Sequence, residues 1–305
     1  MIKKIGLFLT NPSKRFSFLN NRGVFKHIED ETFLKWQYKA NFGVPLHLSF
    51  PRTFNEKMQW LKLHDRNPDY TQYVDKYKVR EFVAEVIGDE YLIPLLGVWD
   101  SPDKVDFSNL PNRFVLKCNH NSGMGMYICR NKKELKEEEV IANLRKGLSQ
   151  DYYWLFREWP YKDVEKRIIA EQFISDGVND ELRDYKVFVF NGKAKYIQVD
   201  INRFSNHKRN FYSVDWEYIP FTTCYPTAPE IKIERPEQLD ELLFLSEKLT
   251  KAAGTPPFLR VDMYVLKERI LFGEMTFYHG AGLEKFYPAE YDLNLGNEIE
   301  LPPFN

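Results

Sequence analysis

The sequence has few cysteines, and their spacing matches no metal or disulfide framework. Only Cys118, Cys129 and Cys224 occur among 305 residues, without a CxxC pair, which argues against a zinc ribbon and a secreted disulfide scaffold. No apolar run reaches the roughly 18 residues that a membrane-spanning helix needs, and no secretory signal pattern opens the chain. With a formal net charge of −1, nothing favours nucleic acid as a partner. We therefore expect a cytoplasmic protein.

The N-terminus departs from this balanced charge. Residues 1–28 contain no acid. Their basic residues are Lys3, Lys4, Lys14, Arg15, Arg22 and Lys26. Interleaved with apolar side chains, such cations would favour an anionic membrane surface by about 1 kcal/mol each. Because Pro12 interrupts any single amphipathic helix, a cationic segment packed on the protein body is the alternative to peripheral contact with the inner membrane.

Apolar periodicity and turn residues predict a mixture of helices and strands. The predicted helices cover residues 30–41, 53–64, 70–87, 132–147 and 236–253. The predicted strands cover residues 113–118 and 126–129 and the runs IIAEQFI, DYKVFVF and KAKYIQV between 168 and 199, with a loop at 202–212. Asn191-Gly192, between two of these runs, is a strong signal for a β-hairpin. No internal repeat is present.

Residues 259–264 and 269–277 predict another hairpin, with charged residues on one face. A loop at 267–269 would pair Asp262 with Glu274, Arg260 with Thr276 and Leu266 with Ile270. The apolar face would hold Val261, Met263, Val265, Leu271, Met275 and Phe277. Opposed carboxylates repel each other unless a cation lies between them. This predicts a Mg²⁺ site completed by waters and phosphate oxygens; the alternative is a solvated hairpin in which Arg260 neutralises Glu274.

A second candidate site is the turn after the strand RFVLKC. Lys117 near the end of this strand is followed by a polar turn containing Ser122, Gly123 and Gly125. Glycines let backbone N–H groups approach a phosphate, and the lysine supplies a positive charge. The turn is neither a Walker A loop nor a dinucleotide-binding fingerprint. A structural turn with a surface lysine is the alternative.

Two histidines are placed for proton transfer. His120 lies in the turn after Lys117, and His279 follows the second strand of the charged hairpin. Imidazole titrates near neutrality and could accept a proton from an amine. A histidine that only hydrogen bonds within a loop is the alternative for both.

The order of these features along the chain resembles the ATP-grasp superfamily, and most of all the TupA-like ATP-grasp proteins of bacterial surface-polysaccharide, capsule and teichuronopeptide loci. The resemblance covers about residues 54–300. The segments that carry it are FNEKMQWLKLHDRNP, VDKYKVREFVAEVIGDEYLIPLLGVW, FVLKCNHNSGM, DYKVFVFNGK, RNFYSVDW and FGEMTFYHGAG.

The resemblance implies an α+β, ATP-grasp fold in which two α+β subdomains enclose ATP. It places an N-terminal helical extension at residues 1–69, the first subdomain at 70–167 and the second at 168–305.

The resemblance also implies roles for individual residues. Lys76 and Lys117 would contact the ATP phosphates, and Arg260 would stabilise the transferring group. The adenine hinge would comprise Glu171, Gln172 and Phe173. Asp262 and Glu274 would bind Mg²⁺, together with Thr276. Many relatives have asparagine at the position of Thr276, and because a threonine hydroxyl is a poorer metal ligand, a second metal ion is in doubt.

The activity that the resemblance implies is ATP-dependent ligation of a carboxylate to an amine through an acyl phosphate. The partners would be an anionic sugar or glycan precursor and an amine such as an amino acid. Candidate substrate-binding residues are Arg183, Lys186, Arg203, Lys208, Arg209 and His279. There are three alternatives: a glycosyltransferase, a non-catalytic ATP-binding module, and a kinase that phosphorylates a sugar. The D-x-D pair of one large class of glycosyltransferases is absent.

Overall fold

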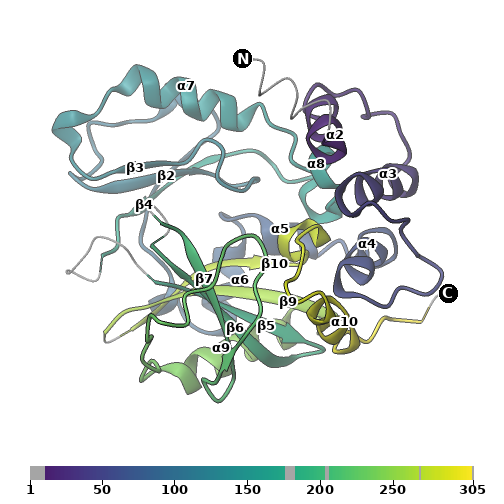
Figure 1. The fold of residues 1–305 in the computed structure, drawn as a ribbon. Helices are drawn as coiled ribbons and strands as arrows, with labels where there is room; N and C mark the ends of the chain where they lie inside the picture. Colours follow the sequence, from purple (N-terminus) through teal and green to yellow (C-terminus); the bar gives the residue numbers. More distant parts are fainter. Residues whose placement is uncertain (1–10, 176–182, 203–205, 268, 304–305) are drawn as a thin grey trace.

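Two antiparallel sheets and a group of helices beside them build the protein (Figure 1). The computed structural model describes residues 11–175, 183–202, 206–267 and 269–303. Both sheets lie on the same side of the helical group, and the smaller sheet lies above the larger one in this view. Among the described residues, no helix combines the length and apolar character needed to cross a membrane.

The smaller sheet has four strands in the order β1-β4-β2-β3. These are β1 (Leu95–Trp99), β2 (Phe114–Cys118), β3 (Tyr127–Cys129) and β4 (Ile168–Gln172). Helix α7 (Glu137–Leu148) covers one face, where Val140 and Leu144 pack with Phe114 and Ile168. The predicted division at 167/168 assigns β4 to the second subdomain, whereas β4 pairs with β1 and β2 in the smaller sheet.

The larger sheet has six strands in the order β10-β9-β5-β6-β7-β8. These are β5 (Asp184–Phe190), β6 (Lys193–Ile201), β7 (Lys208–Ser213), β8 (Tyr218–Ile219), β9 (Phe258–Val265) and β10 (Ile270–Thr276). The predicted turn at Asn191 and Gly192 is confirmed, with φ of 47° and 78°. The predicted loop at 202–212 is wrong in its second half, because β7 pairs with β6 along its whole length and buries Phe211.

Helices from several parts of the chain share the core of the larger sheet. They include α5 (Tyr70–Val74), α6 (Val79–Val86) and α9 (Leu239–Ala252). The predicted single helix at 70–87 is therefore broken. The break lies at Asp75, whose carboxylate accepts hydrogen bonds from the backbone N–H groups of Tyr77 and Lys78, so the chain restarts a helix there rather than continuing one.

The remaining helices form the group beside the sheets (Figure 1). They are α2 (Pro12–Asn20), α3 (Asp30–Phe42), α4 (Phe54–His64), α8 (Tyr153–Phe156) and α10 (Glu290–Asn297). Short 3₁₀ turns are η1 (Asp89–Tyr91), η2 (Pro102–Lys104), η3 (Lys132–Glu134), η4 (Trp159–Tyr161) and η5 (His279–Gly282). A capping box between Thr53 and Glu56 begins α4, which satisfies two N–H groups that a helix start leaves without partners.

The charged hairpin has the predicted register at Asp262 and Glu274 and another register near its tip. Asp262 pairs with Glu274 and Arg260 with Thr276, as predicted, but the register shifts between Phe272 and Glu274. The predicted pair Leu266–Ile270 is wrong, since Ile270 pairs with Val265. Because of this bulge at Gly273, the side chains that precede it lie on the opposite face from the one predicted, whereas those that follow it keep the predicted face. Phe272 therefore packs in the main core, and Leu271 packs instead with Ile93 and Leu266.

Candidate active site

A cavity of about 280 Å³ is lined by residues of both sheets. The smaller sheet supplies Val115, Lys117, Ile128, Glu171 and Gln172, and the larger one supplies Asp184, Lys186, Asp262, Tyr264, Gly273 and Glu274. Lys76, Ile93, Ser122, Gly123, Met126, Arg130, Phe173 and Ile174 complete the lining. Most of the predicted nucleotide and metal residues are therefore brought together in one place.

Asp262 is the most heavily paired carboxylate of this cavity. Arg260 donates from Nε to Asp262 Oδ1 at 2.6 Å and from Nη2 to Oδ2 at 2.8 Å. Lys186 also bonds Asp262, and its Nζ lies 2.5 Å from Asp184 Oδ2. Two cations thus engage both oxygens of Asp262, in the two-pronged geometry that favours arginine.

Glu274 faces Asp262 across the hairpin and is less enclosed. Its Oε2 lies 3.3 Å from Lys76 Nζ, and its Oε1 lies 3.2 Å from Arg260 Nη2. Burial raises the pKa of Glu274, but the positive charges of Lys76 and Arg260 outweigh burial and bring it down to about 2. Glu274 is therefore ionised at neutral pH. The contact with Arg260 is the neutralisation that we considered as the alternative to a metal ion.

The two opposed carboxylates fit a metal ion whose remaining ligands are waters and phosphate oxygens. Among the described residues, no group of three His, Cys, Asp or Glu side chains is arranged around a common metal position. Two opposed carboxylates remain, and Mg²⁺ characteristically uses one or two carboxylates together with waters and phosphate oxygens. Thr276 does not present a free hydroxyl, since its Oγ1 accepts a hydrogen bond from Arg260 Nη2 at 3.1 Å.

A buried chain of polar and charged side chains extends away from Arg260. Arg260 Nη1 lies 2.9 Å from His279 Nδ1, and His279 Nε2 lies 3.2 Å from Glu284 Oε2. Arg209 Nη1 lies 3.3 Å from the same glutamate oxygen, and Arg209 Nε donates to Asp200 at 2.9 Å. Burial lowers the pKa of His279, so the imidazole is neutral and accepts from Arg260 at Nδ1. His279 and Arg209, predicted to bind substrate, lie inside this chain and hold Arg260 in place.

On the other side of the cavity, Glu171 is bound by two cations. Lys117 Nζ lies 2.5 Å from Glu171 Oε2, and Arg80 Nη1 lies 3.6 Å from Oε1. Arg113 stacks over the Phe173 ring at 4.0 Å. Lys117, Glu171 and Phe173 thus form one wall, with Lys76 and Lys186 as further positive charges around the same cavity.

The turn after β2 divides into a part that lines the cavity and a part that is structural. Ser122 and Gly123 line the cavity, and Gly123 has the positive φ, 84°, that favours glycine. At Gly125 a Cβ would lie 2.7 Å from Cys118 Sγ and 2.9 Å from Gly147 Cα. Gly125 is therefore needed where the turn packs against α7, and it is not among the residues that line the cavity.

The structure does not place His120 in the cavity. The ring is buried, with Nε2 2.9 Å from the carbonyl oxygen of Gln150. Burial lowers the pKa of His120 to about 4, so it stays neutral and holds the 147–151 region. Of the remaining predicted substrate residues, Arg183 is exposed before β5, Lys208 begins β7 and Arg203 lies outside the described residues.

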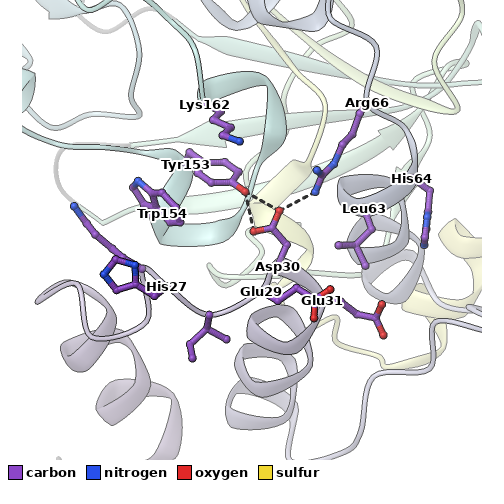
Figure 2. A pocket seen from close by; sticks show the side chains of 12 residues that line it. His27, Glu29, Asp30, Glu31, Leu63, His64, Arg66, Tyr153, Trp154 and Lys162 are labelled. Atoms are coloured by element: carbon purple, nitrogen blue, oxygen red, sulfur yellow. Dashed lines mark hydrogen bonds and ion pairs between the residues drawn. The ribbon is translucent and has the colours of Figure 1, made fainter.

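A larger groove of about 580 Å³ lies among the N-terminal helices (Figure 2). Its lining includes Asp30, Arg66, Tyr153, Trp154 and Lys162. In Figure 2 the Tyr153 hydroxyl and the Arg66 guanidinium both point at Asp30, at 2.7 Å and 2.8 Å. None of the predicted site residues lies in this groove. Asp30 is already satisfied by protein groups, so this network joins α3 to the segment after α7.

Comparison with known proteins gives one family and several remote structural similarities. The sequence model of the family described as TupA-like ATPgrasp matches residues 56–300. No curated protein is significantly similar to the chain.

Three of the similar solved structures show that the similarity to this chain is remote. A D-alanine–D-alanine ligase from Bacillus anthracis complexed with ATP is 16% identical, with 67% of this chain and 54% of that chain covered and a TM-score of 0.40. The biotin carboxylase β,γ-ATP complex from Campylobacter jejuni is 15% identical, with coverages of 81% and 49% and a TM-score of 0.43. An ATP-grasp ligase, PsnB, with Mg and ADP is 9% identical, with coverages of 92% and 69% and a TM-score of 0.42. The chain thus spans about half the length of the first two proteins.

Proposed function

The match over residues 56–300 means that the chain belongs to the TupA-like ATP-grasp family, and from this premise we propose that it is an ATP-dependent ligase that joins a carboxylate to an amine. The observation that carries the proposal is the cavity itself. It combines Glu274 and Asp262 in opposed positions with Lys76, Lys117 and Lys186. Such a set suits a polyphosphate with its counter-cation.

In the proposed reaction, the protein positions ATP and a substrate carboxylate for phosphoryl transfer. Lys76 and Lys117 bind phosphate oxygens, and the Ser122–Gly123 turn offers backbone N–H groups. Asp262 and Glu274 would hold Mg²⁺, which offsets the charge of the phosphates when it is bound. The substrate carboxylate oxygen attacks the γ-phosphorus and ADP leaves; the amine then attacks the acyl carbon and phosphate leaves. Arg260, held by Asp262 and His279, supplies a positive charge where negative charge develops.

We further propose that the carboxylate belongs to an anionic sugar or glycan precursor of a bacterial surface polysaccharide and that the amine is an amino acid. The support is the family resemblance together with the exposed cation Arg183, which directly precedes β5. Because β5 supplies Asp184 and Lys186 to the cavity, a positive charge there would attract an acidic glycan. Lys208, half-buried at the start of β7, is a further candidate.

Product analysis tests this function. We expect Mg-ATP, a uronic-acid sugar and an amino acid to give ADP together with a product whose mass is that of the two substrates minus one water. Mass spectrometry of the complete mixture, with each substrate omitted in turn, measures both. A sugar that gains only a phosphoryl group would overturn the ligase proposal in favour of a kinase.

The basic N-terminus supports a separate proposal, peripheral contact with an anionic membrane surface. In α2 and the following turn, Phe18 and Leu19 are 43% and 40% exposed, and Arg22 stacks over the Phe18 ring at 3.5 Å. We expect binding to vesicles of anionic phospholipid that weakens with salt, and at least tenfold weaker binding when Lys14, Arg15 and Arg22 are all changed to glutamate. Vesicle co-sedimentation measures this, with neutral vesicles as control. Equal binding of the charge-reversed protein would rule out the contact.

A further inference from the structure

Lys186 is a buried lysine that lines the cavity but takes no part in the reaction steps proposed above. It lies on β5 and is 6% exposed. Its Nζ lies 2.5 Å from Asp184 Oδ2 and also contacts Asp262 Oδ2. Because opposite charges nearby favour the charged form of a lysine, a positive charge is fixed between two carboxylates of the cavity.

The pairing of the strands holds this ammonium group in place. Lys186 is directly opposite Asp262 of β9, and Asp262 is directly opposite Glu274 of β10. Directly opposed residues share a face of the sheet, and Asp184, two residues before Lys186, shares that face as well. The ammonium therefore stands in a row of charges across three strands, beside the proposed Mg²⁺ position.

Asp262 is already occupied by three donors. Arg260 Nε and Nη2 donate to its two oxygens at 2.6 and 2.8 Å, and Lys186 also bonds Oδ2. An ionised carboxylate has about four acceptor sites, so about one is left for a metal ion. Thr276 Oγ1 accepts a hydrogen bond from Arg260 as well. Asp262 can thus bind one cation, but it cannot bridge two.

Glu274 has room for one ion. Its oxygens lie 3.2 Å from Arg260 Nη2 and 3.3 Å from Lys76 Nζ, which leaves about two of its four acceptor sites. Two-metal sites for phosphoryl transfer hold their ions about 3.5–4 Å apart, and both ions need protein ligands. In the part of the chain that the structure describes, no three His, Cys, Asp or Glu side chains surround a common metal position. The carboxylates of the hairpin therefore suffice for one divalent ion.

Lys186 can supply the charge that a second ion would bring. An ammonium group has three N–H donors, and Asp184 and Asp262 account for two of them. Because Lys186 lines the cavity, its third N–H can be offered to a phosphate oxygen. A lysine ammonium is a compact point charge suited to this task.

We propose that the cavity binds one divalent cation together with ATP, and that the ammonium of Lys186 takes the place of a second one. This inference rests on the proposed function and specifies the metal content of its nucleotide site. Asp262 and Glu274 would hold the single ion at the hairpin, while Lys186 offsets phosphate charge from β5. This part of the charge compensation belongs to the chain itself.

The ratio of bound metal to bound nucleotide tests the proposal without requiring turnover. The full-length protein is dialysed to equilibrium against Mn²⁺ and the β,γ-imido analogue of ATP, and both are measured on each side of the membrane. Dialysis without the analogue corrects for Mn²⁺ bound elsewhere. We expect one Mn²⁺ per bound analogue in wild type. The matched control is Lys248→Met, at an exposed position of α9, which should also bind one.

Lys186→Met removes the charge that the proposal equates with a metal ion. At one Mn²⁺ per analogue, we expect this variant to bind the analogue at least tenfold more weakly than wild type. Raising the concentration of free Mn²⁺ should restore its affinity and bring the ratio toward two, because Asp184 and Asp262 have lost their counter-charge. The affinity of wild type should not change over the same range. If circular dichroism shows that Lys186→Met is unfolded, Lys186→Gln replaces it.

The outcomes separate this inference from the ligase proposal. Two Mn²⁺ per analogue in wild type would overturn the inference even if an amide is formed. Affinity of a folded Lys186 variant that equals wild type, or that stays low at high Mn²⁺, would overturn it as well. No analogue-dependent Mn²⁺ binding in wild type would overturn both the inference and the metal site. A ratio of one with recovery of Lys186→Met by Mn²⁺, but without amide product, would keep the inference and overturn the ligase proposal.

Discussion

ADP release by Glu274→Gln is expected to fall by about 100-fold or more, with the fold intact. Glu274 is ionised because its pKa is lowered to about 2 beside Lys76 and Arg260, and it lines the cavity to which residues of both sheets contribute. Glutamine keeps the shape of the side chain but removes the charge. The proposed Mg²⁺ site then loses its less heavily paired carboxylate, since both oxygens of Asp262 are already engaged by Arg260 and Lys186. Coupled measurement of ADP in the presence of both substrates gives the rate.

The matched control for this prediction is Glu138→Gln, which removes one charge from the exposed face of α7 and should keep the wild-type rate. Glu138→Gln should unfold at the temperature of wild type. Glu274→Gln should be less stable, because the pKa of Glu274 is lowered by Lys76 and Arg260 and its charge therefore stabilises the folded state, so circular dichroism at the assay temperature checks that this variant is folded. Activity of Glu274→Gln above a few per cent of wild type would contradict the assignment of Glu274 as the metal-binding carboxylate.

The central part of this site could be predicted because it depends on local periodicity. Alternation along two adjacent strands places Asp262, Glu274 and Arg260 on one face, and the structure pairs them as that pattern requires. The TupA-like ATP-grasp family was also identifiable from motif order, and the family match over residues 56–300 confirms it. The roles of individual residues in binding ATP and Mg²⁺ stay predictions.

Other features depend on contacts between distant segments, which a single sequence does not display. The bulge at Gly273 reverses the faces of Leu271 and Phe272 because the packing of the tip outweighs strict alternation. Arg209 and His279 are cations at plausible positions, but only the fold shows that Glu284 lies between them.

The free energy of unfolding is expected to fall by about 3–5 kcal/mol in Asp30→Ala. The Asp30 carboxylate accepts hydrogen bonds from Tyr153 at 2.7 Å and from Arg66 at 2.8 Å, and it faces Arg157 at 3.1 Å. Because the Arg157 side chain is fully buried, removing its anionic partner leaves an uncompensated charge inside the protein. Urea-induced unfolding followed by fluorescence measures the change.

The neighbouring residue provides the control for this second prediction. Glu31 forms a surface pair with Lys35 at 2.5 Å, with both side chains close to half exposed, so Glu31→Ala should change stability by less than about 0.5 kcal/mol. A loss in Asp30→Ala no larger than in Glu31→Ala would mean that backbone carbonyls alone satisfy Arg157.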